Sequence, residues 1–277
     1  MRVGIHTGLT DLDQLAERCR QMDVDDVIMG IGTFAEFRKQ EYVTSASVAA
    51  LKDEMAQRGI RLAGITPPSP SPEAVLGDNE NEVENLCKII RALGEADVEM
   101  MHFYPLDRFK NYKEEYHHEK PPLEVMPGEE KWEIVIGFFR RLADMAEEAD
   151  VKISNHVFAA DIMLEILDTV GSPNLGVTYC TGTYIFGYDP YTTINLFGIE
   201  RIFICHARNL VRHSPGRQGH EEVPLESGDI DMARYIRILT ELGYDGLIVP
   251  EHWGKTGDLS SSVAYLRKLI NQSQPRP

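Results

Sequence analysis

Short apolar runs rich in valine and isoleucine alternate along this chain with longer amphipathic stretches, and the alternation recurs eight times. The expected strands are 3–6, 26–30, 62–66, 98–104, 151–156, 175–180, 201–206 and 247–252. The expected helices are 12–22, 45–58, 81–93, 130–148, 161–170, 190–197, 232–242 and 259–271. Eight strand–helix pairs predict an α/β fold, and a (β/α)8 TIM barrel fits them better than an open doubly wound sheet.

The length of the chain sets the domain organisation. The 277 residues would allow two domains by simple division, but α/β barrels of about 250 residues fold as one unit. A hydrophobic content of 43% is enough for a large core. We therefore expect a single barrel domain over 1–272, followed by a frayed tail at 273–277.

The net charge of the chain narrows the classes of partner. A formal charge of −16 argues against binding nucleic acid or a membrane through a basic surface. No stretch approaches the roughly 20 apolar residues of a membrane helix, and residues 1–15 lack an apolar signal core, so we expect a cytoplasmic protein. Neither glycine-rich nucleotide-binding signature is present. A small molecule is the expected partner. The sequence is also compatible with a homo-oligomer.

Five of the nine histidines lie at the end of an expected strand. They are His6, His102, His156, His206 and His252. In a parallel barrel the carboxyl ends of the strands form one rim, where the active site sits. Histidine is the commonest metal ligand and titrates near neutral pH. The placement therefore indicates chemistry at this rim.

Four residues that close strands five to eight predict a metal site: His156, Cys180, His206 and Glu251. Two imidazoles, a thiolate and a carboxylate suit Mn, Fe, Co or Zn, whereas an all-oxygen site for Mg or Ca would not recruit a cysteine. Each residue taken singly could equally be an ordinary buried side chain. Cys205 precedes His206 and should face the opposite side of its strand, toward a helix.

Further candidates surround this expected metal site. His252 follows Glu251 and could reach the rim where the backbone turns, as an acid/base or as a partner of a ligand. Lys255 is a second catalytic candidate, although a solvated loop lysine is the simpler interpretation. His6 and His102 could line the substrate side of the pocket or could be structural histidines.

Two expected connections between a strand and the following helix are long, 105–129 and 207–231. Loops of this length in a compact domain are usually functional or disordered. Both could cover a substrate, or they could form surface or subunit contacts. Arg208, Arg212 and Arg217 lie in the second connection, and an arginine fork matches a carboxylate, as in a sugar acid. A solvated basic loop is the alternative.

At these residues the sequence resembles the mannonate dehydratase family, within the xylose isomerase-like TIM-barrel superfamily of sugar isomerases and epimerases. The segments that carry the resemblance are VKISNH ending at His156, GVTYCTGT (176–183), FICHARNL (203–210), SGDIDM (227–232) and VPEHWGK (249–255). The family's His-Pro-Asp-Asp becomes His-Val-Phe-Ala from His156 onward, and its ligand Asp becomes Glu251.

The resemblance implies a divalent metal ion, with Mn as the first choice, and removal of water from a sugar acid such as D-mannonate. His252 would take the proton next to the carboxylate, and one or more of the three arginines would anchor that carboxylate. A metal-dependent sugar isomerase or epimerase is the alternative enzyme. A sugar-acid-binding barrel without catalysis is the alternative outside enzymes.

Overall fold

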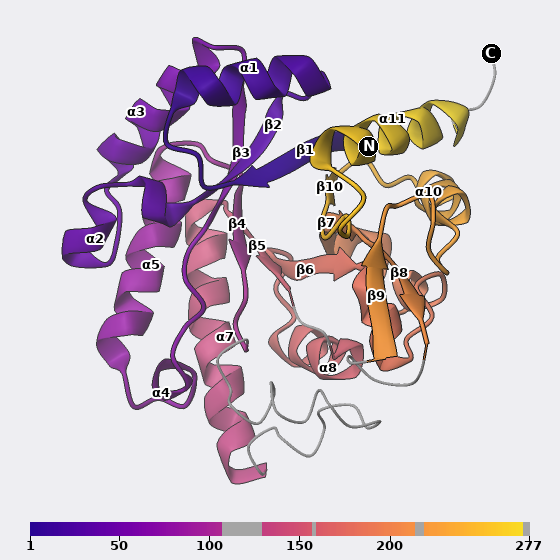
Figure 1. The fold of residues 1–277 in the computed structure, drawn as a ribbon. Coiled ribbons are helices and arrows are strands. Elements are labelled where there is room, and N and C mark those ends of the chain that lie inside the picture. Colours follow the sequence, from indigo (N-terminus) through magenta and orange to yellow (C-terminus); the bar gives the residue numbers. More distant parts are fainter. Residues whose placement is uncertain (107–128, 157–158, 214–218, 274–277) are drawn as a thin grey trace.

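The computed structural model is a closed parallel barrel, as the alternating pattern predicts (Figure 1). It describes residues 1–106, 129–156, 159–213 and 219–273. The strands follow the circular order β1-β10-β7-β6-β5-β4-β3-β2. Their bounds are β1 Arg2–Thr7, β2 Asp26–Gly30, β3 Arg61–Thr66, β4 Met100–Phe103, β5 Lys152–Asn155, β6 Leu175–Cys180, β7 Ile202–Ala207 and β10 Leu247–Pro250. The predicted fold is therefore confirmed.

Helices surround the barrel on the outside (Figure 1). The main ones are α1 Leu12–Met22, α3 Ser45–Ala56, α5 Glu80–Glu95, α7 Glu129–Ala149, α8 Ala160–Val170, α9 Thr193–Phe197, α10 Met232–Glu241 and α11 Leu259–Ser273. Short helices α2 (Phe37–Gln40) and α4 (Pro72–Val75) lie in connections that the sequence pattern left as loops. They are too short to show a helical period.

Local signals explain where the helices begin and end. Asp11 caps α1 by accepting from the backbone N–H groups of residues 13 and 14, and Gly171 ends α8 with a φ of +72°. A left-handed φ suits glycine, which has no Cβ to clash with the backbone. These ends set how each helix returns to the next strand.

The apolar core has two parts. A large cluster fills the layer between the strands and the surrounding helices. A smaller cluster, drawn only from strand residues, fills the barrel interior: Ile28, Ala63, Met100, Phe203, Ile204, Leu247 and Val249. Apolar side chains therefore fill the barrel interior, as in other TIM barrels. The polar strand-end residues lie beyond this interior cluster, at the carboxyl ends of the strands.

A β-hairpin occupies part of the second long connection. Strands β8 (Asn209–Arg212) and β9 (His220–Val223) pair antiparallel, and they stand outside the barrel (Figure 1). The first long connection lies mostly outside the described residues, so its predicted role as a cover stays a prediction. This hairpin differs from the expectation of a long loop over 207–231.

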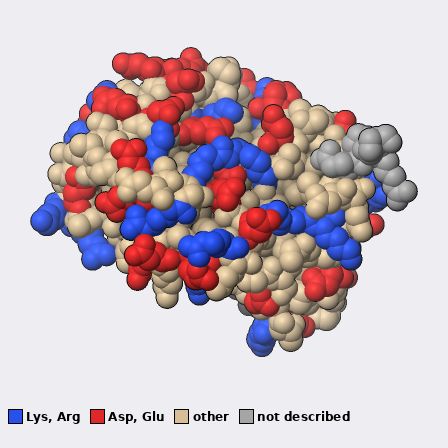
Figure 2. Space-filling model, turned by 90° about the horizontal axis from the view of Figure 1, so that it is seen from above, with Lys and Arg blue, Asp and Glu red and all other residues tan. Residues whose placement is uncertain are grey.

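Charges of both signs are mixed on the surface. Figure 2 shows Lys and Arg interleaved with Asp and Glu over one face, without a broad basic area. Asp26, at the start of β2, is buried and pairs with Arg2 and Arg61 of the two neighbouring strands. In the described part of the chain, no helix combines the length and apolar character needed to cross a membrane.

Candidate metal centre

The four predicted metal-ligand candidates meet at the carboxyl ends of neighbouring strands. Cys180 of β6 and His206 of β7 are register partners, so they stand at the same height. Glu251 follows β10 directly, and its N–H donates to the Ala207 carbonyl at 2.9 Å. His156 follows β5, and its N–H donates to the Phe103 carbonyl at 2.7 Å. Backbone hydrogen bonds between neighbouring strands thus extend to these residues and fix their position along the barrel axis.

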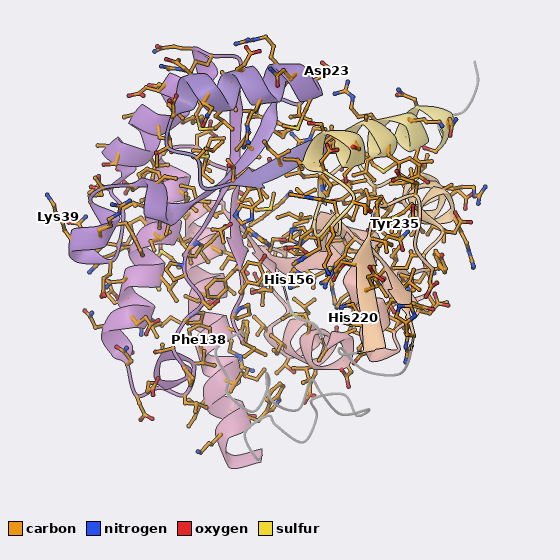
Figure 3. The ribbon with its side chains drawn as sticks, viewed as in Figure 1. Asp23, Lys39, Phe138, His156, His220 and Tyr235 are labelled. Atoms are coloured by element: carbon orange, nitrogen blue, oxygen red, sulfur yellow. The ribbon has the colours of Figure 1, made fainter. Side chains whose placement is uncertain are left out.

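The donor atoms of these four residues converge. One ligand atom from each of His156, Cys180, His206 and Glu251 lies within 4.8 Å of the others. The first three side chains are buried, and that of Glu251 is 23% exposed. Figure 3 shows His156 near the centre of the molecule, far from surface residues such as Lys39. The structure therefore brings together the four residues that the sequence analysis had selected.

Electrostatics within the cluster couple His206 to Glu251. His206 Nδ1 lies 3.3 Å from Glu251 Oε2. Burial alone would lower the pKa of His206, but the charge of Glu251 raises it to about 10. Burial would raise the pKa of Glu251, but His206 holds it well below its usual range. His206 would give up its proton on ligating a metal, because a ligand imidazole is neutral.

The donor set fits a borderline divalent ion. Sulfur, two imidazoles and a carboxylate in one buried cluster match the preferences of Mn, Fe, Co or Zn. The Gly182 N–H donates to Cys180 Sγ at 3.3 Å. The residues present therefore fit a metal of this class.

His252 reaches the same site through an unusual backbone conformation. Its φ is +53°, in the left-handed region that non-glycine residues seldom adopt. This turn lets both Glu251 and His252 face the rim, with His252 Nε2 3.7 Å from Glu251 Oε2. Its side chain is 51% exposed, and burial together with nearby Arg208 lowers its pKa. A neutral His252 can accept a proton.

His6 and His102 flank the metal-ligand candidates at the rim, because β1 is next to β10 and β4 is next to β5. Their rings are 5.5 Å apart, and the His102 ring is 5.0 Å from that of His206. His102 is completely buried, and its Nδ1 is 3.1 Å from Thr66 Oγ1. The ring of Tyr104 packs against His102 and His156, at 4.8 and 4.9 Å. His6 is exposed and His102 is not, so only His6 faces open space.

That open space is a cavity of about 480 Å³ beside the metal-ligand candidates. It is lined by His6, His206, Glu222, Val249, Pro250, Glu251, His252, Trp253 and Gly254. Its size falls within the range of about 300–1,000 Å³ that is usual for small-molecule sites. Two of the predicted metal ligands, His206 and Glu251, and the predicted base His252 thus line one cavity.

Arg208 is held by the hairpin. It is 6% exposed, and its Nε donates to Glu222 Oε1 at 2.7 Å, with a second contact from Nη2. His220 Nε2 lies 3.5 Å from the same oxygen. Burial alone would lower the pKa of Arg208, but the bond to Glu222 and nearby negative charges raise it above its usual value. Its predicted contact with a substrate carboxylate stays a prediction.

The other predicted residues lie farther out. Arg212 is partly buried on β8, 5.9 Å from the centre of the Tyr184 ring. Lys255 is exposed in the loop after Glu251. Arg217 lies outside the described residues. The roles suggested for these three residues stay predictions.

Sequence reasoning overlooked Glu222, His220, Tyr104 and Thr66. Tyr104 and Thr66 lie at the ends of predicted strands, so their position was a usable signal. Glu222 and His220 carried no comparable signal, because the hairpin that brings them to the barrel was not predicted. Figure 3 shows His220 on β9, beside the barrel.

Comparisons with known proteins agree with this architecture. Mannonate dehydratase from Streptococcus agalactiae serotype Ia is 30% identical over 153 residues, which cover 47% of this chain and 43% of that protein. The match thus spans less than half of that relative. The mannonate dehydratase of Oceanobacillus iheyensis is 24% identical over 302 residues, covering 82% of this chain and 85% of the relative.

The fold is shared with solved structures. The crystal structure of mannonate dehydratase from Streptococcus suis serotype 2 superposes with a TM-score of 0.78 at 17% identity, covering 99% of this chain and 93% of that one. A family model described as "xylose isomerase-like TIM barrel" matches residues 16–269. The resemblance to mannonate dehydratases is therefore confirmed, and the chain belongs to the xylose isomerase-like TIM barrel family.

Proposed function

We propose that this protein is a divalent-metal-dependent hydro-lyase that removes water from a sugar acid, as the names of its relatives suggest. One observation carries the proposal: four donor atoms lie within 4.8 Å of one another, and two of the residues that supply them, His206 and Glu251, line a cavity that His252 also lines. His156, Cys180, His206 and Glu251 would hold the metal. Mn²⁺ is our first choice, and Zn²⁺, Fe²⁺ and Co²⁺ suit the same donors.

The bound metal would act as a Lewis acid that acidifies the proton on C2 and stabilises the enediolate left by its removal. His252 takes that proton at Nε2, which faces Glu251 at the cavity. The C3 hydroxyl leaves as water after a second acid protonates it, and the C2–C3 enol then loses the proton on its C2 oxygen and gains one at C3 from solvent to give a 2-keto-3-deoxy acid. Burial of His156, Cys180 and His206 keeps bulk water away from these three donor side chains.

The proposal is tested by turnover. Mn²⁺-loaded protein should convert D-mannonate or a related sugar acid to a 2-keto-3-deoxy product, measured by chemical assay and mass spectrometry. Turnover of neutral aldoses or ketoses, with none of sugar acids, would contradict the proposal. Binding of sugar acids without turnover of any would favour a binding barrel instead.

A variant at His252 tests the assigned base. His252→Asn should lower kcat by about 10²–10⁴-fold with metal content unchanged, because Asn accepts the left-handed backbone but cannot take the proton. His213→Asn is the matched control, since the His213 side chain is exposed beside the hairpin and lies 3.9 Å from the equally exposed Glu221. An active His252→Asn enzyme would remove His252 from the mechanism.

The alternative function, a sugar isomerase or epimerase, is favoured by the state of Arg208. Its guanidinium is already paired with Glu222, and a neutral sugar would need no cationic anchor. The turnover panel above separates the two functions, because only the dehydratase yields a product that has lost water.

A further inference from the structure

Glu222 stands at the metal-site cavity although it comes from the hairpin. It lies on β9 and lines the same cavity as Glu251 and His252. A Cβ on Gly254 would lie only 2.4 Å from the Glu222 carbonyl oxygen, so β9 presses directly against the loop that follows Glu251. This contact fixes the height of Glu222 relative to the metal-ligand candidates.

The two oxygens of this carboxylate have different surroundings. Oε1 accepts from Arg208 Nε at 2.7 Å and lies 3.5 Å from His220 Nε2. Oε2 is buried and has no hydrogen-bond partner among the described residues. Buried Arg208 is paired with this carboxylate, so its guanidinium occupies the Oε1 side. A carboxylate oxygen, Oε2, is thus left without a donor beside a cavity.

A buried acceptor without a donor is costly, so native structures satisfy such groups from some source. A sugar hydroxyl is a donor of the right kind, whereas a second carboxylate would be repelled. The acid head of a substrate belongs at the metal. Its hydroxyl-bearing tail is therefore the part that suits Glu222.

We propose that Glu222 is a specificity-determining residue whose Oε2 accepts a hydrogen bond from a distal hydroxyl of the ligand at the metal centre. The inference rests on the proposed function in that the ligand is a hydroxylated acid. In this arrangement Arg208 is a positioning residue: it holds Oε1 and leaves Oε2 for the ligand. This differs from the direct carboxylate anchor that the sequence predicted for Arg208.

The test compares the product of the proposed reaction with a smaller ligand that shares its head group. 2-Keto-3-deoxy-D-gluconate carries distal hydroxyls, whereas pyruvate has the same 2-keto acid head and none. Their dissociation constants are measured by calorimetry on Mn²⁺-loaded wild type, Glu222→Gln and Glu221→Gln. Glu221 is the matched control, because it neighbours Glu222 on β9 but is 63% exposed.

Glu222→Gln should weaken binding of 2-keto-3-deoxy-D-gluconate by about 10–100-fold, the usual effect of losing a charged hydrogen bond. Pyruvate binding should stay within about twofold, and Glu221→Gln should change neither constant. If Glu222→Gln does not fold, Glu222→Asp is used instead. Its shorter side chain moves the carboxylate oxygens away from the ligand, so it should show the same selective loss.

An equal loss for both ligands, no loss for either, or no binding by wild type would overturn the inference. Turnover of D-mannonate by wild type is measured separately. A selective loss without turnover contradicts the proposed dehydratase and supports the hydroxyl subsite. Turnover without a selective loss supports the dehydratase and refutes the subsite.

Discussion

His102 shows how a single residue is adapted to the crowded rim. It is completely buried among His6, His206 and Tyr104, and it contacts Thr66 Oγ1 through Nδ1. Burial first, and then the neighbouring histidines, lower its pKa well below the usual value. A neutral His102 keeps additional positive charge away from the place where a metal ion would bind.

This neutrality predicts a pH-dependent stability. Below about pH 6.5 the unfolded chain binds a proton at His102 that the folded chain does not, so the unfolding free energy falls as the pH falls. His102→Gln, which can still bond Thr66, should remove up to about 1.4 kcal/mol per pH unit of this slope in metal-free protein. Denaturant titrations at several pH values test this. Parallel pH profiles for variant and wild type would show that His102 does not titrate on unfolding.

Among the elements, the hairpin β8–β9 depends on one buried amide. Asn209 Nδ2 donates to the carbonyls of Leu225 at 2.6 Å and Ile230 at 2.9 Å. Its Oδ1 accepts from the backbone N–H groups of Leu210 and Ile230. One side chain thus joins the hairpin to the turn before α10. Glu222 depends on this connection for its position.

Removal of that amide should therefore affect more than stability. Asn209→Ala leaves buried backbone groups without partners and should lower the unfolding free energy by about 2–4 kcal/mol. It should also weaken ligand binding through displacement of Glu222. Asn195→Ala is the control, because Asn195 is exposed on α9 and its change should stay within about 0.5 kcal/mol. Denaturant unfolding checks both, and a neutral Asn209→Ala would contradict this role.

At the scale of the whole molecule, the ring of helices packs closely where α5 meets α7. A Cβ on Gly94 would lie 2.2 Å from the Ala149 carbonyl oxygen, so the helices approach each other through the missing side chain. By contrast, a Cβ on Gly137 of α7 would have no described atom within 4 Å. The two glycines serve different purposes although both are helical.

This contrast predicts opposite effects of the same substitution. Gly94→Ala should destabilise the fold by about 1–3 kcal/mol through overpacking. Gly137→Ala should stabilise it by up to about 1 kcal/mol, because alanine favours the helix. Thermal or denaturant unfolding measures both, and metal content should be unchanged in each. Equal effects at the two sites would show that the close approach is not a packing constraint.

The barrel could be predicted because apolar runs and amphipathic stretches alternate regularly along the sequence. The metal-ligand candidates could be predicted because they stand at the ends of those apolar runs. Cys180 and His206 each end an apolar run, and parallel pairing then places such ends at one rim. The surroundings could not be predicted in the same way. Glu222 reaches the cavity only through a hairpin in a charged segment. Glu251 and His252 both face the rim only because His252 adopts a positive φ. Neither the hairpin nor the positive φ of His252 produces a periodic pattern of apolar residues in the sequence.

Metal content of the purified protein tests the central claim most directly. Elemental analysis should find about one divalent ion per chain in wild type, as for a single four-ligand site. Cys180→Ala and His206→Ala should each lose most of it. Cys19→Ala, which changes a buried cysteine on α1 away from the site, should keep it. Full metal retention by both ligand variants would contradict the site described here.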